Sequence, residues 1–271
     1  MTEERHEVLE FLNGIRPGEQ PGTWIGDVPA SWGQQIFGGM TVGHAVMALT
    51  REAPPGRRLH SLHAYYVRPT NGGDPITYAI EPIRDGRSFS TARFAASQRG
   101  KITFEGTCSF TADADGYEYD QPHLGVLPSR AEGGQADWGP AVFESVVLGP
   151  TAPDANGAYE STDRKWLRVP APLDDDVHLH TALIGVASDW TGIGSRPRRL
   201  YWNDGDEYGI ASLDHAVWFH RPPDVTQWHF SDMHALVNFG GRSHVRITIR
   251  DEAGRVVASA AQELLVKVLP D

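Results

Sequence analysis

Apolar and polar positions alternate along the chain in a helix-like pattern and then in a series of strand-like patterns. Between residues 37 and 53, one helical face is apolar at the spacing i, i+3, i+4, i+7: Val42, Ala45, Val46 and Leu49. A proline-rich stretch directly afterwards is expected to end this helix. Four runs rich in β-branched and aromatic residues, joined by short turns, are predicted as strands: 59–68, 76–83, 89–98 and 101–110.

The same order of patterns returns in the second half. A second helical stripe carries six apolar residues, with three aspartates before it that suit a helix N-terminus: Leu179, Ala182, Leu183, Val186, Ala187 and Trp190. Four more strands are predicted over 210–220, 227–238, 244–250 and 256–269. In the third of these, Val245, Ile247 and Ile249 alternate with polar residues, which predicts a strand with one buried face.

Three sequence landmarks also repeat at nearly one offset. The Arg-Pro motif recurs from Pro69 to Pro222, a shift of 153 residues. The Gly-Arg-Ser turn recurs from Gly86 to Gly241, a shift of 155, and the Gly-basic turn from Gly100 to Gly254, a shift of 154. This period is far too long for a solenoid repeat of about 20–50 residues, so it indicates a duplicated domain.

Each half is therefore expected to be one helix followed by an antiparallel meander, which makes the fold class α+β. Residues 112–176 between the halves are rich in Gly, Pro and Asp, with possible strands at 141–148 and 165–169. A structureless loop of this length suits a crossover between two units better than the inside of one. The predicted division is an N-terminal unit at 1–112, a crossover linker at 113–140 and a C-terminal unit at 141–271.

Composition excludes several classes of function. The net charge of −11 argues against nucleic acid as a partner, and no apolar stretch is long enough to span a membrane. The charged N-terminus lacks a signal core, so a cytoplasmic protein is expected. Cys108 is the single cysteine, and His178 and His180 do not share a helical face, so no metal site is predicted.

Two polar residues, Gln262 and Asp189, occupy unusual positions in the second half, whereas Ser212, at a strand end, is by itself an ordinary solvated serine. Gln262 interrupts an otherwise apolar face of the last strand, and a buried amide without partners costs roughly 1–3 kcal/mol. It is either a core residue bonded to backbone or part of a site. Asp189 borders the apolar helical stripe at the helix C-terminus, where the dipole gives a carboxylate no help, and helical spacing alone favours an ordinary solvated flank residue.

The duplication adds information about these positions. At an offset of 153, Ser212 corresponds to Leu59, and at 154, Gln262 corresponds to Cys108. Polar groups thus occur in the second copy at places where the first is apolar. That asymmetry predicts one active site per duplicated unit, carried by the C-terminal half.

The chain resembles the TesB-like (type II) acyl-CoA thioesterases, which are double-hotdog proteins. The matching stretches, spread over most of the chain, are 36–39, 60–69, 84–89, 187–189, 212–215 with 218–222, and 257–263. They include the Ala-Ser-Asp that ends at Asp189, the Asp-His that follows Ser212 by two residues, and the Gln-Glu that begins at Gln262. Together these motifs are specific, although no single one would be.

The resemblance implies a function and a set of site residues. The family holds its hydrolytic water with an Asp, a Thr or Ser, and a Gln, which places Asp189, Ser212 and Gln262 in the catalytic roles. The substrate would be acyl-CoA, with no cofactor and no metal, and a homodimer or homotetramer is expected. Met40 stands where family members commonly have Gln, so substrate contacts near the first helix, and with them the preferred acyl-chain length, are not carried over from the family.

Further candidates concern substrate binding. The chain has no Gly-x-Ser-x-Gly nucleophile elbow, so direct attack by water is favoured over an acyl-enzyme route. Gly38 and Gly39, which open the first helix, are candidate oxyanion donors through their N–H groups, or form a plain helix-entry turn. Arg198 and Arg199 belong to the densest basic cluster, which either meets the phosphates of CoA or is a solvated loop.

Two other functions remain open from the sequence. A hotdog dehydratase or hydratase would use a His paired with a carboxylate, and a catalytically inactive hotdog protein would bind acyl-CoA without hydrolysing it. The presence of all three polar residues argues against the second possibility. Thiol release, hydration of enoyl-CoA and binding alone would distinguish the three.

Overall fold

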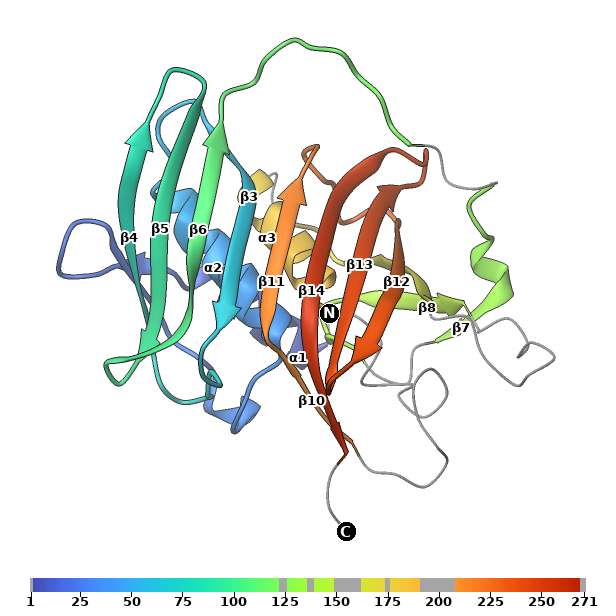
Figure 1. Ribbon diagram of the computed structural model, residues 1–271, viewed down its shortest axis with the longest axis horizontal. Coiled ribbons are helices and arrows are strands. Elements are labelled where there is room, and N and C mark those ends of the chain that lie inside the picture. The colour runs from blue at the N-terminus through green and yellow to red at the C-terminus, as the bar shows by residue number, and fades with distance from the viewer. Residues whose placement is uncertain are drawn as a thin grey trace.

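Among the described residues, one antiparallel sheet of 14 strands forms the frame of the molecule. Figure 1 shows how the strands lie side by side. The computed structural model describes residues 2–121, 126–135, 139–148, 162–173, 176–190 and 208–268. The strands lie in the order β1-β2-β4-β5-β6-β3-β11-β14-β13-β12-β9-β8-β7, and β10 pairs with β14. The strands of the first half therefore occupy one side of the sheet and those of the second half the other.

The predicted elements of the first half are confirmed, with small changes at their ends. They are α2 (Gly38–Arg51), β3 (Arg58–Tyr66), β4 (Ile76–Asp85), β5 (Phe89–Gln98) and β6 (Lys101–Thr111). All four residues of the predicted stripe on α2 are fully buried. Since the opposite face of each strand is largely exposed, the pattern of alternate burial sets which face packs against the helices.

The second half follows the same plan. It consists of α3 (Val177–Ser188), β10 (Tyr208–Ser212), β11 (Asp214–Phe219), β12 (His229–Phe239), β13 (Arg242–Asp251) and β14 (Val256–Val268). Asp176 caps α3 by accepting a 2.9 Å hydrogen bond from the N–H of His178, in agreement with the predicted acidic N-terminus. The single strand predicted over 210–220 is wrong, because Leu213 separates β10 from β11.

Three β-bulges confirm the duplication at the level of the backbone. The register shifts between Leu59 and Ser61 in β3, and it shifts between Ser212 and Ala216 where β10 gives way to β11 along β14. The shift between Pro82 and Arg84 is matched between 235 and 237, and that at 96–97 is matched at 249–250. These pairs share the offset of 153, so Leu59 and Ser212 occupy equivalent positions.

The two copies join edge to edge through β3 and β11. These strands are antiparallel, with His63 opposite Ala216, Ala64 opposite His215 and Leu62 opposite Val217. His63 and Ala216 are themselves 153 residues apart, so the local twofold relation between the copies passes through this pair. The sheet is therefore continuous across the duplication.

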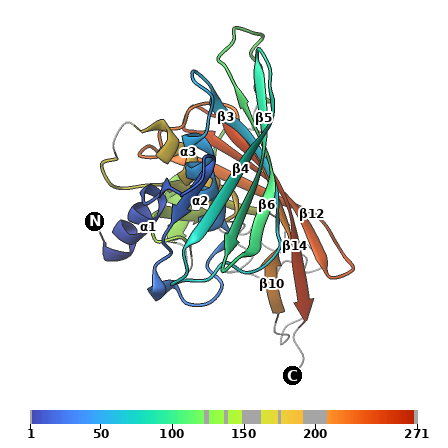
Figure 2. The same cartoon turned by 90° about the vertical axis from the view of Figure 1, so that its left-hand side faces the viewer.

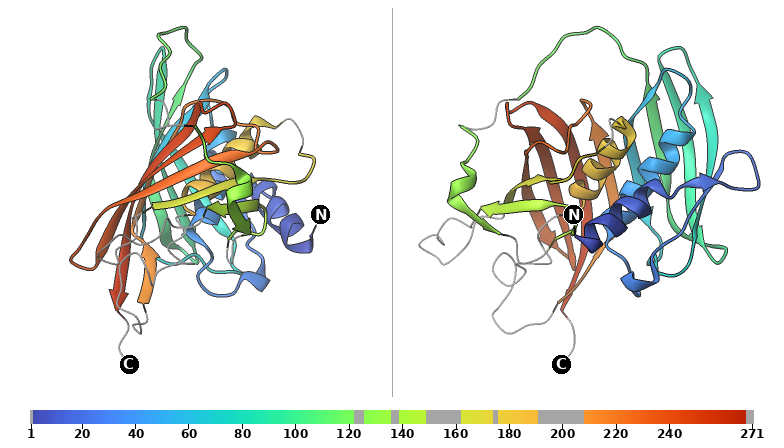
Figure 3. Two further views of the ribbon diagram at one scale, coloured as in Figure 1. Left: turned by 90° about the vertical axis from the view of Figure 1, so that its right-hand side faces the viewer. Right: turned by 180° about the vertical axis from the view of Figure 1, so that it is seen from behind.

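The helices cover one face of the sheet, as Figures 2 and 3 show. Gly39 lies against the carbonyl of Val186 and Gly43 against that of Ala182, so α2 and α3 run antiparallel and in close contact. A Cβ on Gly43 would lie 2.5 Å from Cγ2 of Val186, which explains why glycine is needed there. This approach brings the N-terminus of α2 to the C-terminus of α3.

Several elements were not predicted. The helix α1 (Glu3–Asn13) has Thr2 as its N-cap and buries Val8, Leu9, Phe11 and Leu12 in the main core. The sheet also gains β1 (Arg16–Pro17), β2 (Thr23–Gly26) and β7 (Gly133–Gln135), and two 3-10 turns occur at Ala30–Trp32 and Arg130–Glu132. The possible strands within the crossover region are present as β8 (Glu144–Leu148) and β9 (Thr162–Arg168).

Candidate active site

The three polar residues singled out from the sequence meet at one carboxylate. The hydroxyl of Ser212 donates a 3.3 Å hydrogen bond to Oδ1 of Asp189, and Nε2 of Gln262 donates to the same oxygen. These residues come from three separate elements: the C-cap of α3, the end of β10 and the middle of β14. Groups that are 23 and 73 positions from Asp189 in sequence thus converge on it.

Strand geometry explains how Ser212 and Gln262 reach the same place. Ser212 pairs with Leu264 of β14, and Gln262 lies two residues before Leu264, on the same face of that strand. The register shift after Ser212 ends β10 and sends β11 alongside β3. A bulge at such a point re-aims side chains, which is a common device beside active sites.

Burial determines the electrostatics of Asp189. Its side chain is 1% exposed, and desolvation raises its pKa to about 7. Hydrogen bonds from Gln262, Ser212 and Tyr66 and from the N–H of Gly39 favour the charged form and oppose this rise. The carboxyl is therefore poised between its two protonation states near neutral pH.

The N-terminus of α2 provides the electrostatic support for the Asp189 carboxylate that the C-terminus of α3 does not provide. The N–H of Gly39 donates to Asp189, and the partial positive charge of a helix N-terminus favours a carboxylate. A Cβ on Gly38 would lie 2.7 Å from Oδ2 of Asp189, so glycine permits this close approach. The sequence-based expectation that Asp189 gains nothing from a helix dipole considered α3 alone and missed α2.

Tyr66 is a site residue that the sequence analysis did not identify. Its phenol donates a 3.3 Å hydrogen bond to Oδ1 of Asp189, and burial together with the nearby carboxylate raises its pKa well above the ordinary value. The equivalent position in the second copy, 153 residues later, is Phe219, which has no hydroxyl. The comparison of copies that singled out Ser212 would therefore have found Tyr66 as well.

Two further polar residues lie behind the carboxylate. Nδ1 of His215 is 3.7 Å from Oδ1 of Asp189, and its Nε2 is 2.8 Å from Oγ of Ser188. Desolvation lowers the pKa of His215 to about 3, so the ring is neutral at physiological pH. At the offset of 153 its counterpart is Leu62, again an apolar residue in the first copy.

A cavity of about 210 Å³ opens next to these groups. Its walls come from the turn before α2, the end of β3 and the junction of β10 with β11, and include Gly38, Tyr66 and Ser212. Tyr66 and Ser212 in this wall hydrogen-bond to the carboxyl of Asp189, and Gly38 packs against it. Asp189 and Gln262 themselves are not among the lining residues, so these contacting groups lie between the cavity and the carboxyl.

The remaining predicted substrate residues have different placements. Met40 is 6% exposed and packs in the main hydrophobic core, and it is not among the described residues that line the cavity. Arg198 and Arg199 lie outside the described residues. Gly38 and Gly39 lie at the carboxyl, while their use as oxyanion donors stays a prediction.

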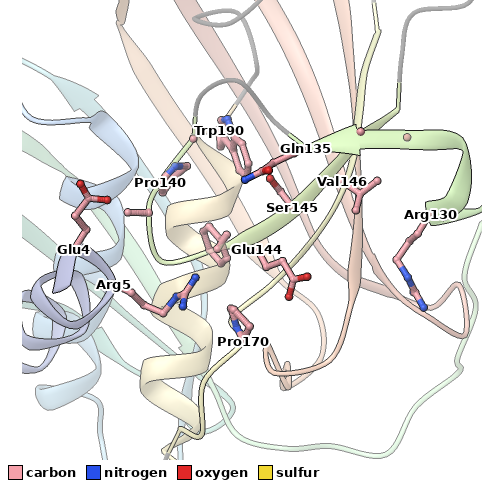
Figure 4. A pocket seen from close by; sticks show the side chains of 15 residues that line it. Glu4, Arg5, Arg130, Gln135, Pro140, Glu144, Ser145, Val146, Pro170 and Trp190 are labelled. Carbon is pink, nitrogen blue, oxygen red and sulfur yellow. The ribbon is translucent and has the colours of Figure 1, made fainter. Parts of the chain in front are cut away.

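A wider hollow of about 780 Å³ lies elsewhere, between α1 and the strands β7 and β8 (Figure 4). Its wall includes Trp190, the residue after Asp189, together with Arg5 and Gln135. None of Asp189, Ser212 and Gln262 lines it, whereas Ser212 lines the smaller cavity, so its size alone does not make it the reaction site.

Comparison with known proteins places the chain in a family. The family model of the acyl-CoA thioesterase N-terminal domain matches residues 28–111, and that of the C-terminal domain matches residues 122–266. The chain belongs to the acyl-CoA thioesterase family. This confirms the TesB-like resemblance and identifies the chain as a thioester hydrolase acting on acyl-CoA.

Individual relatives support this assignment along the whole chain. Acyl-CoA thioesterase 2 of Haemophilus influenzae is 27% identical over 256 residues, which cover 86% of this chain and 88% of that protein. The crystal structure of the acyl-CoA thioesterase II TesB2 from Mycobacterium marinum has a TM-score of 0.81 at 27% identity, covering 96% of this chain and 98% of the other.

A more distant structure supports the fold alone. A conserved protein with a hot dog fold from Alicyclobacillus acidocaldarius has a TM-score of 0.77 at 17% identity, over 97% of this chain and 99% of that one. The predicted α+β double hotdog is confirmed. None of the helices described here is long and apolar enough to cross a membrane.

Proposed function

We propose that this acyl-CoA thioesterase acts by direct attack of water on the thioester carbonyl, with Asp189 as general base and with Ser212 and Gln262 positioning the water. The observation that carries the proposal is the convergence of a hydroxyl and a carboxamide on one buried carboxylate beside a cavity. No histidine or cysteine is among the described residues that line this cavity.

The state of Asp189 suits a general base. A base works best when its pKa is close to the working pH, and burial raises that of Asp189 to about 7. Proton transfer to a positioned base contributes ~10²–10⁴-fold to a rate. An exposed carboxylate, with a pKa near 4, would be a much weaker proton acceptor.

Ser212 and Gln262 can hold a water as well as the carboxylate. The hydroxyl of Ser212 can both donate and accept. Oε1 of Gln262 is buried without a hydrogen-bond partner among the described residues, which leaves an acceptor for one hydrogen of a water. A water that donates to Asp189 and to Oε1 of Gln262 would have both hydrogens directed, and of its two lone pairs one could accept from Ser212 and the other is left for attack.

The bonds and protons balance without a cofactor. The water oxygen bonds to the thioester carbon while one of its protons moves to Asp189. The tetrahedral intermediate then expels the thiolate of CoA as the carbon–sulfur bond breaks. Asp189 returns its proton to the thiolate, so the products are the carboxylic acid and CoA, and the enzyme is unchanged.

The rival activities fit these groups less well. A hydratase would need a histidine that reaches the substrate next to a carboxylate. His215 is near Asp189, but its side chain is 0% exposed and lies behind the carboxyl. A protein that only binds acyl-CoA has no use for a buried carboxylate whose pKa is displaced toward neutrality.

The variant Asp189→Asn tests the proposal, because it keeps the shape of the side chain and removes the base. Thiol release from a panel of acyl-CoA substrates should fall by about 10³-fold in kcat, while titration still shows acyl-CoA binding. A kcat within a few-fold of the wild type would reject Asp189 as the base. Hydration of an enoyl-CoA by the wild type would instead identify a hydratase.

The same variant carries a thermodynamic control. A carboxyl whose pKa is raised in the folded state stabilises the fold below its unfolded pKa, and that contribution is lost as the pH rises through about 7. The melting temperature of Asp189→Asn relative to the wild type should therefore increase between pH 4 and pH 8. A constant difference would show that the carboxyl is not displaced.

A further inference from the structure

A histidine and a serine behind Asp189 form a buried polar pair outside the set of water-holding groups. The side chain of His215 is 0% exposed, and Ser188 is likewise fully buried. Oγ of Ser188 lies 2.8 Å from Nε2 of His215 and donates a 2.8 Å hydrogen bond to the carbonyl of Gly185. Neither residue lines the cavity beside Ser212.

The hydrogen bonds of Ser188 fix the tautomer of the ring. The carbonyl of Gly185 is in the last turn of α3, and the hydroxyl of Ser188 donates its single proton to this carbonyl. The oxygen of Ser188 therefore accepts from His215. The ring proton is therefore on Nε2, and Nδ1 carries a lone pair.

That lone pair faces the carboxyl. Nδ1 is 3.7 Å from Oδ1 of Asp189 and has no hydrogen-bond partner among the described residues. A separation beyond hydrogen-bond range is expected when a lone pair meets a carboxylate oxygen. A proton on the carboxyl would turn this repulsive contact into an attractive one.

Packing alone does not require a histidine at this position. The β3–β11 pairing sets His215 opposite Ala64 and, symmetrically, Leu62 opposite Val217. Leu62 is the equivalent of His215 at the offset of 153 and is fully buried in the same core. A leucine therefore fills this place in the first copy, so the polar ring of the second copy calls for a different explanation.

We propose that His215 is a positioning residue for Asp189, acting through a neutral ring that Ser188 orients so that Nδ1 presents its lone pair to the carboxyl. The negative end of the ring dipole then disfavours the charged carboxylate and makes it a stronger base. His215 gains and loses no proton, since the proton taken from water stays on Asp189 until it moves to the thiolate. This inference rests on the proposed role of Asp189.

Other groups around Asp189 act in the opposite sense. Tyr66 from β3, Ser212 from β10 and Gln262 from β14 all donate to the carboxyl, as does the N–H of Gly39 from α2. The ammonium of Lys165 from β9 bonds to the carbonyl of Trp190, the next residue. His215 thus opposes the effect of several groups that favour the charged form of Asp189.

The first experiment is the pH profile of kcat/KM for Ser188→Ala and His215→Gln. Without Ser188 the ring proton can move to Nδ1 and donate to Asp189, and a glutamine amide can do the same. The acid limb should shift down by roughly one pH unit in both variants, with a lower plateau. A purely structural role would lower the whole profile without moving the limb.

Two matched controls exist in the other helix. The hydroxyl of Thr50 donates to the carbonyl three residues before it in the last turn of α2, as Ser188 does in α3. His44 is a fully buried histidine of α2 bonded to Tyr78. Thr50→Val and His44→Gln should leave the acid limb in place.

The second experiment needs no activity. The ¹⁵N shifts of the His215 ring, assigned by their loss in His215→Gln, should report a neutral Nε2–H tautomer between pH 5 and pH 9. A ring protonated at Nδ1, or an acid limb unmoved in both variants, would overturn the inference. Failure of Asp189→Asn to lose activity would instead reject the proposed function and leave the measured tautomer unaffected.

Discussion

The two copies share a backbone that coincides down to the position of three β-bulges, but they differ in the residues that face the helices. Leu59 corresponds to Ser212, Leu62 to His215 and Cys108 to Gln262. The first copy folds with apolar residues at all three places, and they are buried. The polar residues of the second copy are therefore not needed to build this frame, and their cost in burial points to chemistry.

The first copy still contributes to the site. It supplies the phenol of Tyr66 and the N–H of Gly39, and both donate to Asp189. The two copies thus differ in what they contribute: the second supplies the proposed base and the groups proposed to hold the water, and the first supplies donors that favour the charged carboxylate. The site lies where the N-terminus of α2 meets the C-terminus of α3, and both units contribute to it.

The strongest test of this comparison makes the same change in each copy. Gln262→Ala should lower kcat/KM for acyl-CoA by about 10²-fold, because a positioned hydrogen-bonding group beside the reacting water is lost. Cys108→Ala, at the equivalent position, should change kcat/KM by less than about two-fold while lowering the melting temperature. Equal losses of activity would show that the asymmetry between copies has no catalytic meaning.

A smaller effect is expected from Tyr66→Phe, which gives the first copy the residue of its counterpart Phe219. The phenol hydrogen bond favours the carboxylate, so its removal should raise the pKa of Asp189 above its present value of about 7. The acid limb of kcat/KM should move up by roughly half a pH unit to one unit. Activity at pH 6 would then fall several-fold more than activity at pH 9.

A shift of that limb to lower pH would contradict the hydrogen-bond assignment of Tyr66. The direction is opposite to the one expected for Ser188→Ala. The two variants together therefore show whether the groups in front of the carboxyl and those behind it act in opposite senses. The double variant should have an acid limb between those of the two single variants.

The smallest change in activity is expected at the contact between the helices. A Cβ on Gly43 would lie 2.5 Å from Cγ2 of Val186 and 3.0 Å from the carbonyl of Ala182. Overpacking of this kind costs about 1–3 kcal/mol, so Gly43→Ala should lower the melting temperature by roughly 3–10 °C. At Gly185 the nearest atom is 3.3 Å away, and better helix propensity offsets the crowding, so Gly185→Ala should be nearly neutral.

Calorimetry of the two alanine variants checks this difference. Equal melting temperatures would mean that the helices can move apart without loss of stability. Since Gly39 and Asp189 meet at the same contact, such freedom would also weaken the case for a fixed hydrogen bond between them.

Much of the fold could be predicted from local pattern. Both helical stripes and seven of the eight predicted strand runs have structural counterparts, because a buried face leaves a clear period in the sequence. The break at Leu213 leaves no such sign, since it depends on which neighbours pair with each part of the strand. The helix α1 is short and lies among charged residues, which concealed its apolar stripe.

The site was only partly predictable. Ser212 and Gln262 are indicated by the difference between the copies, and all three residues including Asp189 by the resemblance; the same difference between copies exists at Tyr66 and His215. The contact of Gly39 with Asp189 could not be found that way, because it depends on the close approach of two helices far apart in sequence. A comparison of all equivalent positions would have recovered the side chains but not this backbone donor.

The seam between β3 and β11 has a consequence for the behaviour of each unit when it is expressed alone. Each unit expressed alone would present the full length of an inner strand, with its row of unpaired amide and carbonyl groups, to solvent. Such a unit would be expected to pair this strand with an edge strand of another molecule, either a second copy of the unit or an unrelated protein. With both units in one chain that pairing is internal, and the two sides of the seam can carry different residues.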